Sequence, residues 1–241
     1  ASVLVFDMHN EYAYNDTASD TGMGVTGLKT KLGSKIQVVG LGGGATIRNN
    51  PPDFNMELAM SDITPADVLL LSRALDLRDT SATTLDALYG SYKYNWFENF
   101  KNMNQDTVIN EEGKKVPAEG SVAQWAGSVG VNSMAAEGLH SKLRQLFNKP
   151  YIVSKPAADS IGQMIDVLDA GRNIVLSFGK FESDLDYLLV SNLLTRKIRE
   201  RWEERTNEFR SHPESSSEPR QLIIVLEEAH KLLNREMAGQ T

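Results

Sequence analysis

Short runs of apolar residues, separated by polar and glycine-rich stretches, mark the candidate strands of this chain. They lie at residues 3–6, 36–39, 173–178 and 222–226, with a shorter one at 151–153. Runs of this length and β-branched content are typical of strands in a parallel sheet covered by helices. We therefore expect a parallel sheet, and we expect the strand at 222–226 to be buried on both of its faces.

Apolar positions at helical spacing alternate with the later strands. Residues 158–168 are expected to form a helix that Gly171 closes as the first residue beyond its C-cap. A longer helix is expected from Ser183 to about Phe209, and its end at 196–210 mixes basic and acidic residues. Such mixing is typical of a solvated, salt-bridged face, which we favour over a DNA contact. The alternation predicts an α/β fold.

Residues 49–150 differ in character and are expected to form a helical subdomain. Thr64, Pro65 and Asp67 form a capping-box start for one helix. Further helices are expected at 85–97 and at 121–147, the latter with a break near Asn132, and residues 101–120 are expected to be a loop. Trp96, Trp125 and Tyr94 are expected to pack inside this subdomain. The predicted organisation is therefore 1–48, 49–150 and 151–241.

Composition narrows the class of protein. The chain has 241 residues, a formal net charge of -7 and no cysteine, so disulfides and thiolate metal sites are excluded. It contains no apolar run of the ~18–20 residues that a membrane span needs and no signal peptide, so we expect a cytoplasmic protein with no membrane partner. The acidic balance argues against a surface broadly coated with nucleic acid, although a local basic patch stays possible. Because the chain opens on a strand at Ala1 without a methionine, we expect it to be a piece of a longer protein.

Two polar constellations follow predicted strands. Glu227 and Glu228 come directly after the strand at 222–226, and the segment from Asp7 to Tyr12 follows the strand at 3–6. Because the carboxyl ends of parallel strands lie at one edge of a sheet, we expect the two constellations to meet there. The plainer alternatives are solvated acids at a helix start and a polar turn.

The two constellations together resemble the signatures of HerA-like ATPases, which are ring-forming DNA translocases of the HerA/FtsK superfamily. The segment 3–12 is similar to their Asp-x-His-Gly-Glu-Tyr signature, and the segment 222–230 is similar to their Walker B strand with Glu-Glu-Ala-His. The resemblance implies a RecA-like P-loop NTPase fold, here an incomplete parallel sheet with an inserted helical subdomain. It also implies ATP and Mg²⁺ as cofactors, double-stranded DNA as substrate, a homo-hexamer and a NurA-like nuclease partner, in DNA end processing and repair.

The resemblance also implies roles for individual residues. Glu227 matches the Walker B acid that holds Mg²⁺ through water, and Glu228 matches the catalytic glutamate that orients the attacking water. Asp7 matches an acid near the γ-phosphate and the metal. Three further residues are placed near the nucleotide: His9, Glu11 and His230.

The sequence departs from this family in two places. Asn10 stands where the family usually has glycine, and asparagine is the non-glycine residue that best tolerates the left-handed region, so the turn can survive. No Gly-x-x-x-x-Gly-Lys-Ser/Thr loop occurs in these residues, and the glycines of 40–44 lack the lysine, so we expect a turn there. Residues 1–241 alone are therefore expected to bind nucleotide poorly and to be inactive.

The motifs of two other classes of protein do not fit this sequence. DEAH-box helicases lack an Asp-x-His-x-Glu-Tyr element, and a zinc protease would need a second histidine where Asn234 stands. Two alternatives stay open: a conjugation or secretion motor of the same superfamily, and a non-catalytic interaction module that keeps the sheet.

Overall fold

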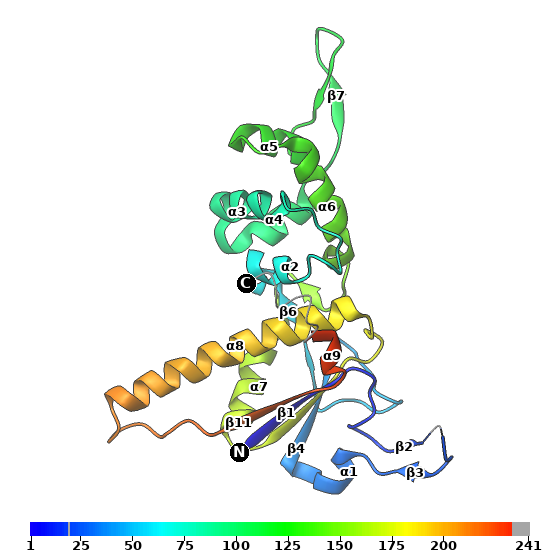
Figure 1. The fold of residues 1–241 in the computed structure, drawn as a ribbon, viewed down its shortest axis with the longest axis vertical. Helices are drawn as coiled ribbons and strands as arrows, with labels where there is room; N and C mark the ends of the chain where they lie inside the picture. Colours follow the sequence, from blue (N-terminus) through cyan, green and yellow to red (C-terminus); the bar gives the residue numbers. More distant parts are fainter. Residues whose placement is uncertain (19, 233–241) are drawn as a thin grey trace. The chain divides into compact units, whose positions relative to one another are not determined.

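The computed structural model describes residues 1–18 and 20–232, which fold as two compact units (Figure 1). Unit 1 combines Ala1–Glu57 with the chain from Pro156 onward, and unit 2 is Leu58–Lys155. Unit 2 begins later than the expected position 49, because residues 54–56 pair with the main sheet of unit 1. It ends at Lys155 rather than 150, because the strand near residue 152 pairs inside unit 2.

Unit 1 is built on a five-stranded sheet in the order β11-β1-β10-β4-β5. Every neighbouring pair is parallel, as the apolar runs predict. The strands are β1 (Ser2–Asp7), β4 (Ile36–Leu41), β5 (Phe54–Met56), β10 (Asn173–Ser177) and β11 (Leu222–Leu226). The mixed α/β architecture with a parallel central sheet is consistent with the expected RecA-like fold.

Helices cover both faces of this sheet. On one face, α7 (Ser160–Asp169) packs on β1, β5 and β10, and α8 (Asp184–Ser211) packs against α7 (Figure 1). Gly171 ends α7 with a positive φ of 82°, and its N–H and that of Arg172 bond back to the carbonyls of Leu168 and Val167. This is the predicted glycine-terminated helix end.

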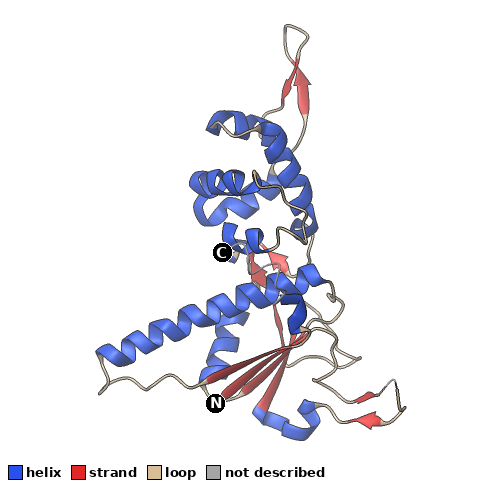
Figure 2. Ribbon diagram, in the orientation of Figure 1, coloured by secondary structure: helices blue, strands red, loops and turns tan. Residues whose placement is uncertain are grey.

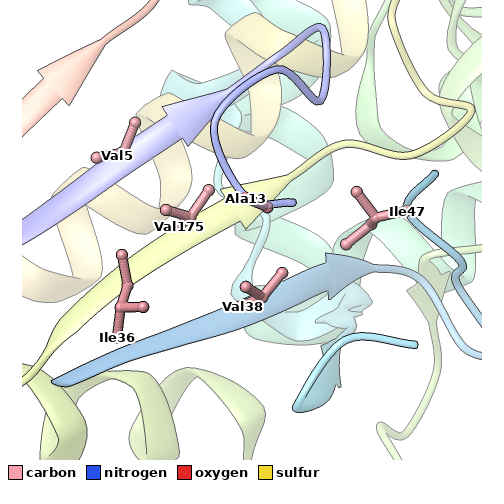
Figure 3. Packing of buried hydrophobic residues seen from close by; sticks show 6 residues of the cluster. All are labelled: Val5, Ala13, Ile36, Val38, Ile47 and Val175. Atoms are coloured by element: carbon pink, nitrogen blue, oxygen red, sulfur yellow. The ribbon is translucent and has the colours of Figure 1, made fainter. Parts of the chain in front are cut away.

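A small apolar cluster covers the opposite face (Figure 3). Alternate residues of three strands point into it, and Leu28 of α1 (Leu28–Leu32) packs against it. The buried members are Val5, Ala13, Ile36, Val38, Ile47 and Val175. Since the cluster joins β1, β4 and β10 to the loops that follow β1 and β4, it fixes the base of both loops.

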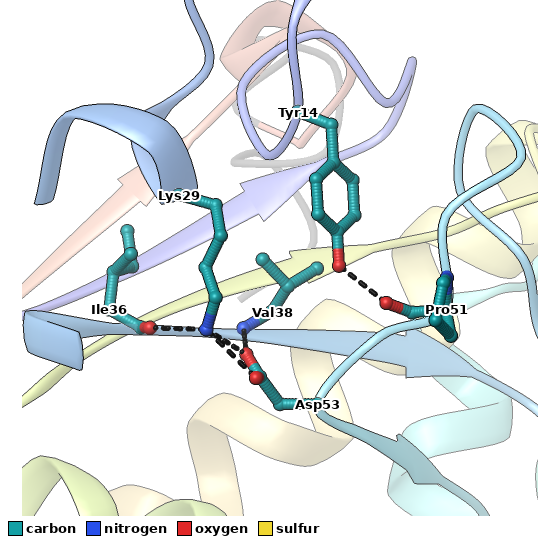
Figure 4. A network of polar contacts seen from close by, with 6 residues as sticks. All are labelled: Tyr14, Lys29, Ile36, Val38, Pro51 and Asp53. Atoms are coloured by element: carbon teal, nitrogen blue, oxygen red, sulfur yellow. Dashed lines mark hydrogen bonds and ion pairs between the residues drawn. The ribbon is translucent and has the colours of Figure 1, made fainter. Parts of the chain in front are cut away.

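A network of polar contacts holds the loop that follows β4 (Figure 4). The carboxylate of Asp53 accepts the backbone N–H of Val38 at 2.7 Å and pairs with the Lys29 ammonium at 2.6 Å. The Tyr14 hydroxyl donates to the carbonyl of Pro51 at 2.6 Å. These contacts tie α1 and the loop after β1 to the segment that leads into β5.

The burial predicted for β11 is wrong. Its residues alternate between half-buried and exposed, and Ile223 and Val225 are 51% and 42% exposed. The physical reason is its place: among the described residues β11 is an edge strand that pairs with β1 on one side. Ile223 and Val225 share the face of Val3 and Val5 by register, beyond the part that the apolar cluster covers.

Smaller elements complete unit 1. The sequence did not predict α1 or the hairpin of β2 (Asp16–Thr17) and β3 (Gly24–Val25). A short 3-10 turn, Gly33–Lys35, leads into β4, and α9 (Ala229–Leu232) follows β11. The charged end of α8 carries the predicted salt bridges, for example Arg199 with Glu203 at 2.6 Å.

Unit 2 is mostly helical, as predicted (Figure 2). Thr64 and Asp67 form a reciprocal capping box at the start of α2. Asn132 caps α6 at the predicted break, and Trp96 and Trp125 are buried, whereas Tyr94 is 68% exposed and so does not pack as expected. The helices are α2 (Pro65–Leu70), α3 (Ser81–Tyr92), α4 (Trp96–Asn102), α5 (Val122–Val129) and α6 (Ser133–Phe147), with 3-10 turns at Met60–Asp62 and Lys93–Asn95.

Three predictions for unit 2 are wrong in detail. The helix expected at 85–97 is two helices, because Lys93 adopts a positive φ of 52° and breaks the chain direction between α3 and α4. The loop expected at 101–120 contains an antiparallel hairpin of β7 (Thr107–Ile109) and β8 (Lys115–Pro117). The strand expected near 152 exists as β9 (Ile152–Val153), but it pairs with β6 (Leu58–Ala59) rather than with the main sheet.

Across residues 1–18 and 20–232, we find no helix that combines the length and the apolar character needed to cross a membrane.

Candidate functional site

The two polar constellations lie at one edge of the main sheet. Strands β1 and β11 are parallel neighbours, and their register pairs Phe6 with Leu226. Asp7 and Glu227 therefore leave adjacent strands at the same carboxyl edge, as predicted. A direct contact joins the loop after β1 to Glu227, because the backbone N–H of His9 donates to Glu227 Oε2 at 3.2 Å.

Asp7 is fully buried, and both of its carboxylate oxygens are engaged. Oδ1 accepts the N–H of Glu11 at 2.8 Å, and Oδ2 accepts the Ser177 hydroxyl at 3.0 Å and the N–H of Tyr12 at 3.3 Å. Burial raises the pKa of Asp7 above its ordinary value, and the hydrogen bonds from Glu11 and Ser177 oppose that rise. The carboxylate therefore shapes the loop that follows β1.

Glu227 is held through both its side chain and its backbone. Burial raises the pKa of its carboxyl group, and the negative charge of Asp7 raises it further. The Tyr187 hydroxyl donates to the Glu227 carbonyl at 2.5 Å from the first turn of α8. Two crowded carboxylates with raised pKa values would gain from a nearby cation.

Glu228 follows with a positive φ of 50°, in the left-handed region that few non-glycine residues adopt. Its Oε2 lies 3.2 Å from Nδ1 of His230, whose side chain is 73% exposed. The left-handed residue separates the end of β11 from the start of α9. It therefore gives the Glu228 side chain a direction different from that of Glu227.

Asn10 does more than tolerate the turn after β1. It is buried and has a φ of 60°, as expected for the residue in the glycine position. Its side-chain amide forms a reciprocal pair with Gly179, donating to the carbonyl at 2.9 Å and accepting the N–H at 2.8 Å. Asn10 also donates to Glu182 at 3.1 Å, so it ties the loop after β1 to the loop after β10.

Comparison with known proteins identifies the family of this chain. The family model described as "Helicase HerA, central domain" matches residues 1–198, which includes β1, the whole of unit 2, β10 and the start of α8. The chain belongs to the helicase HerA central-domain family. The family lies within an ATPase superfamily, whose members generally use a nucleotide and Mg²⁺. No curated protein matches the chain.

The HerA family match ends at residue 198, before β11. The placement of Glu227, Glu228 and His230 beside the Asp7 loop therefore comes from the sheet pairing itself. His9 reaches Glu227 through its backbone N–H, and Glu11 is exposed and reaches Asp7 through its backbone N–H. All six predicted residues lie in the two segments that β1 and β11 bring together at this edge.

Sequence reasoning missed several residues that build this site in the HerA-family chain. Ser177, Tyr187 and Gly179 lie on β10, on α8 and between them, where polar residues gave no motif. Arg48 was also missed: its Nε donates to the carbonyl of Asn10 at 2.6 Å, and it pairs with Asp16 at 2.7 Å. A strand that ends in Ser-Phe-Gly is a weak signal, which only the spatial pairing with Asp7 makes specific.

The carboxylates at the edge fit Mg²⁺, which prefers oxygen ligands and keeps several waters. Oε2 of Glu227 accepts the His9 N–H at 3.2 Å, and the backbone N–H of Met8 also bonds to this carboxylate. The described part of the chain holds no group of three or more His, Asp or Glu residues able to enclose a metal ion. Glu227 is thus suited to a metal held partly by water and phosphate rather than to a closed protein site.

The glycine cluster after β4 forms the turn that was predicted for it. Gly42 and Gly44 have positive φ values of 84° and 68°, and the N–H of Gly42 donates to Met56 on β5. A Cβ at Gly40 would lie 2.8 Å from Ala45 and 2.9 Å from Pro52. Gly40 therefore serves close packing against the segment that leads into β5, whereas Gly42 and Gly44 serve the turn.

Proposed function

We propose that the complete protein hydrolyses ATP with Mg²⁺ and uses the cycle to move double-stranded DNA. The observation that carries the proposal is the pairing of β1 with β11, which joins the Asp7–Tyr12 loop to Glu227 and Glu228 at the carboxyl edge of a parallel sheet. Ligands of open α/β sheets bind at this edge. Membership in the helicase HerA family supports DNA as the substrate.

Each acid at the edge has a separate role in this proposal. Glu227 holds Mg²⁺ through water, while the backbone N–H groups of His9 and Met8 fix its carboxylate. When it is bound together with ATP, Mg²⁺ would neutralise part of the negative charge on the phosphates. Asp7 acts through the loop that it shapes, because both of its oxygens are engaged inside the protein.

Glu228 holds and orients the attacking water and accepts its proton. Its carboxylate is accessible, its side chain being 35% exposed, and it contacts Nδ1 of His230 at 3.2 Å. In this proposal His9, Glu11 and His230 are polar neighbours of the nucleotide. A proton acceptor of this kind contributes about 10²- to 10⁴-fold to a rate.

The test is ATP turnover and nucleotide affinity of the complete protein carrying Glu228→Gln. We expect turnover to fall at least about 100-fold while affinity changes only a few-fold, because the residue acts on water rather than on the phosphates. Glu218→Gln, an exposed glutamate in the loop before β11, is the matched control and should retain full turnover. Turnover of Glu228→Gln within a few-fold of wild type would contradict the assignment.

The assembly belongs to the same proposal. We propose a homo-hexamer that encloses DNA and works with a NurA-like nuclease in DNA end processing and repair, as the family resemblance suggests. DNA-stimulated turnover and displacement of a third strand from a triplex would support translocation. A complete protein that binds its partners but has no turnover with or without DNA would instead be an interaction module.

A further inference from the structure

One buried hydroxyl lies where it can control the direction of Glu228. Tyr187 is in the first turn of α8, and its side chain is fully buried. Its ring packs on Phe178 with the centroids 5.3 Å apart. Its hydroxyl donates to the carbonyl oxygen of Glu227 at 2.5 Å, across 40 positions of sequence.

That carbonyl belongs to the peptide that leads into Glu228. The orientation of a peptide plane is set by ψ of the residue before it and φ of the residue after it. Glu228 has a φ of 50°, a conformation that costs a non-glycine residue about 1–2 kcal/mol. Such a conformation persists when the surrounding structure holds it, and the bond from Tyr187 fixes the oxygen of this peptide.

The two acids at the edge are therefore held in different ways. Glu227 has its carboxylate fixed by the N–H of His9 on the β1 loop. The Glu228 carboxylate contacts His230, whose side chain is 73% exposed and so is a weak anchor. The direction of Glu228 depends on its backbone, and that backbone is anchored by α8.

We infer that Tyr187 is a positioning residue for Glu228, acting through the Glu227 carbonyl. The inference rests on the proposed role of Glu228 in hydrolysis. Without the hydroxyl, the peptide between the two glutamates can rotate and release the left-handed φ. Glu228 would then leave the position in which it orients water, while the phosphate and metal contacts would be untouched.

The surroundings of Tyr187 keep its hydroxyl protonated, so that it can donate a hydrogen bond. Burial and the negative charges of Glu227 and Glu228 raise the pKa of Tyr187, so the phenol stays protonated at any physiological pH. A buried hydroxyl without an acceptor is costly, which makes the contact with the carbonyl the stable state of both groups.

The test compares Tyr187→Phe with Tyr14→Phe. Both changes delete a short hydroxyl-to-carbonyl bond in unit 1 and keep the ring, but Tyr14 donates to Pro51 in the loop before β5. In the complete protein we expect Tyr187→Phe to lower kcat for ATP about tenfold or more with KM within about twofold, since small misplacements of a catalytic group are costly. Tyr14→Phe should leave both constants unchanged.

A second measurement needs no nucleotide. In residues 1–241, amide hydrogen exchange at Glu228 and Ala229 should become faster in Tyr187→Phe and stay unchanged in Tyr14→Phe. If Tyr187 served only packing, neither kcat nor exchange at these two amides would change. Either of these results for Tyr187→Phe would overturn the inference.

A double variant separates this inference from the proposed function. When Glu228 is already Gln, Tyr187→Phe should cause no further loss of turnover, because both changes remove the same effect. Independent, multiplying losses would overturn the positioning role. If Glu228→Gln kept its turnover, the proposed function itself would fail; if Glu228→Gln lost it and Tyr187→Phe did not, only the role of Tyr187 would fail.

Discussion

Asp7 is a buried acid whose ionised form lowers the stability of the fold. The size of this effect depends on the hydrogen bond from the Ser177 hydroxyl. The pKa of Asp7 is raised, so the ionised form is disfavoured in the folded state relative to the unfolded chain. This cost is present at pH values above the folded pKa. It disappears as the pH falls through that pKa, because the folded protein takes up the proton first.

Ser177→Ala should therefore raise the pKa of Asp7 further and destabilise unit 1. The hydroxyl bonds to the ionised carboxylate at 3.0 Å, so its loss should cost about 1–3 kcal/mol at neutral pH and less once Asp7 is protonated. The pKa is measured by NMR titration of the carboxyl carbon and the stability by urea unfolding. Ser191→Ala, which removes a buried hydroxyl bonded to the carbonyl of Tyr187, should leave the pKa of Asp7 unchanged.

Asn10→Gly offers a second test at this scale. Glycine accepts the φ of 60° more easily, but the change deletes the paired bonds to Gly179 and the bond to Glu182. Because those bonds are partly buried, we expect a net loss of about 1–2 kcal/mol in the free energy of unfolding. An increase in stability would show that relief of the positive φ outweighs the bonds that link this turn to the loop after β10.

At the scale of elements, replacing a glycine by alanine should lower stability just beyond the end of a helix and raise it inside a helix. Gly171 has a φ of 82° beyond the end of α7, and a Cβ there would lie 3.3 Å from the Arg220 guanidinium. Gly171→Ala should cost about 1–2 kcal/mol. Gly138 lies inside α6 with open space around it, so Gly138→Ala should stabilise unit 2 by about 0.5–1 kcal/mol. Thermal unfolding of both variants checks the two signs.

Elements with strong local signals could be predicted from the sequence, and elements that depend on distant partners could not. The apolar runs located β1, β4, β10 and β11, and the Thr64–Asp67 box located α2. β5 is three residues long after a proline pair, and its existence depends on pairing with β4. The β7–β8 hairpin lies in a polar segment, where alternation carries no apolar face.

The same distinction between local signals and distant contacts explains which residues of the site could be predicted. Asp7, Glu227 and Glu228 each follow a strand, so the rule for parallel strands brought them together. Ser177, Tyr187 and Gly179 were missed because their roles are contacts made across the sheet edge. The exposure of β11 was missed because an apolar run gives no information on whether a strand lies inside or at the edge of a sheet.

For the whole molecule, residues 1–241 should bind ATP with Mg²⁺ only weakly. Backbone amides and a lysine dominate phosphate affinity in this class of ATPase, and this sequence contains no Gly-Lys-Ser/Thr loop. Asp7 and Glu227 at the edge would also repel a triphosphate at neutral pH. Calorimetry on residues 1–241 checks this, with the complete protein as the positive control. Micromolar binding would require a phosphate site of another kind, to be sought first at Gly40–Gly44.

The pairing of β6 with β9 has a consequence for how the chain folds. In the sequence, unit 2 lies between β5 and β10. In the sheet, β10 lies between β1 and β4. Forming the sheet therefore closes a loop that contains all of unit 2. The β6–β9 pair brings Leu58 and Ile152 together, and a folded unit 2 therefore shortens that loop from about 115 residues to about 20, a saving of about 1.5 kcal/mol in closure entropy. Unit 2 thus sets the order of assembly, and a variant that unfolds unit 2 alone should slow the refolding of the sheet.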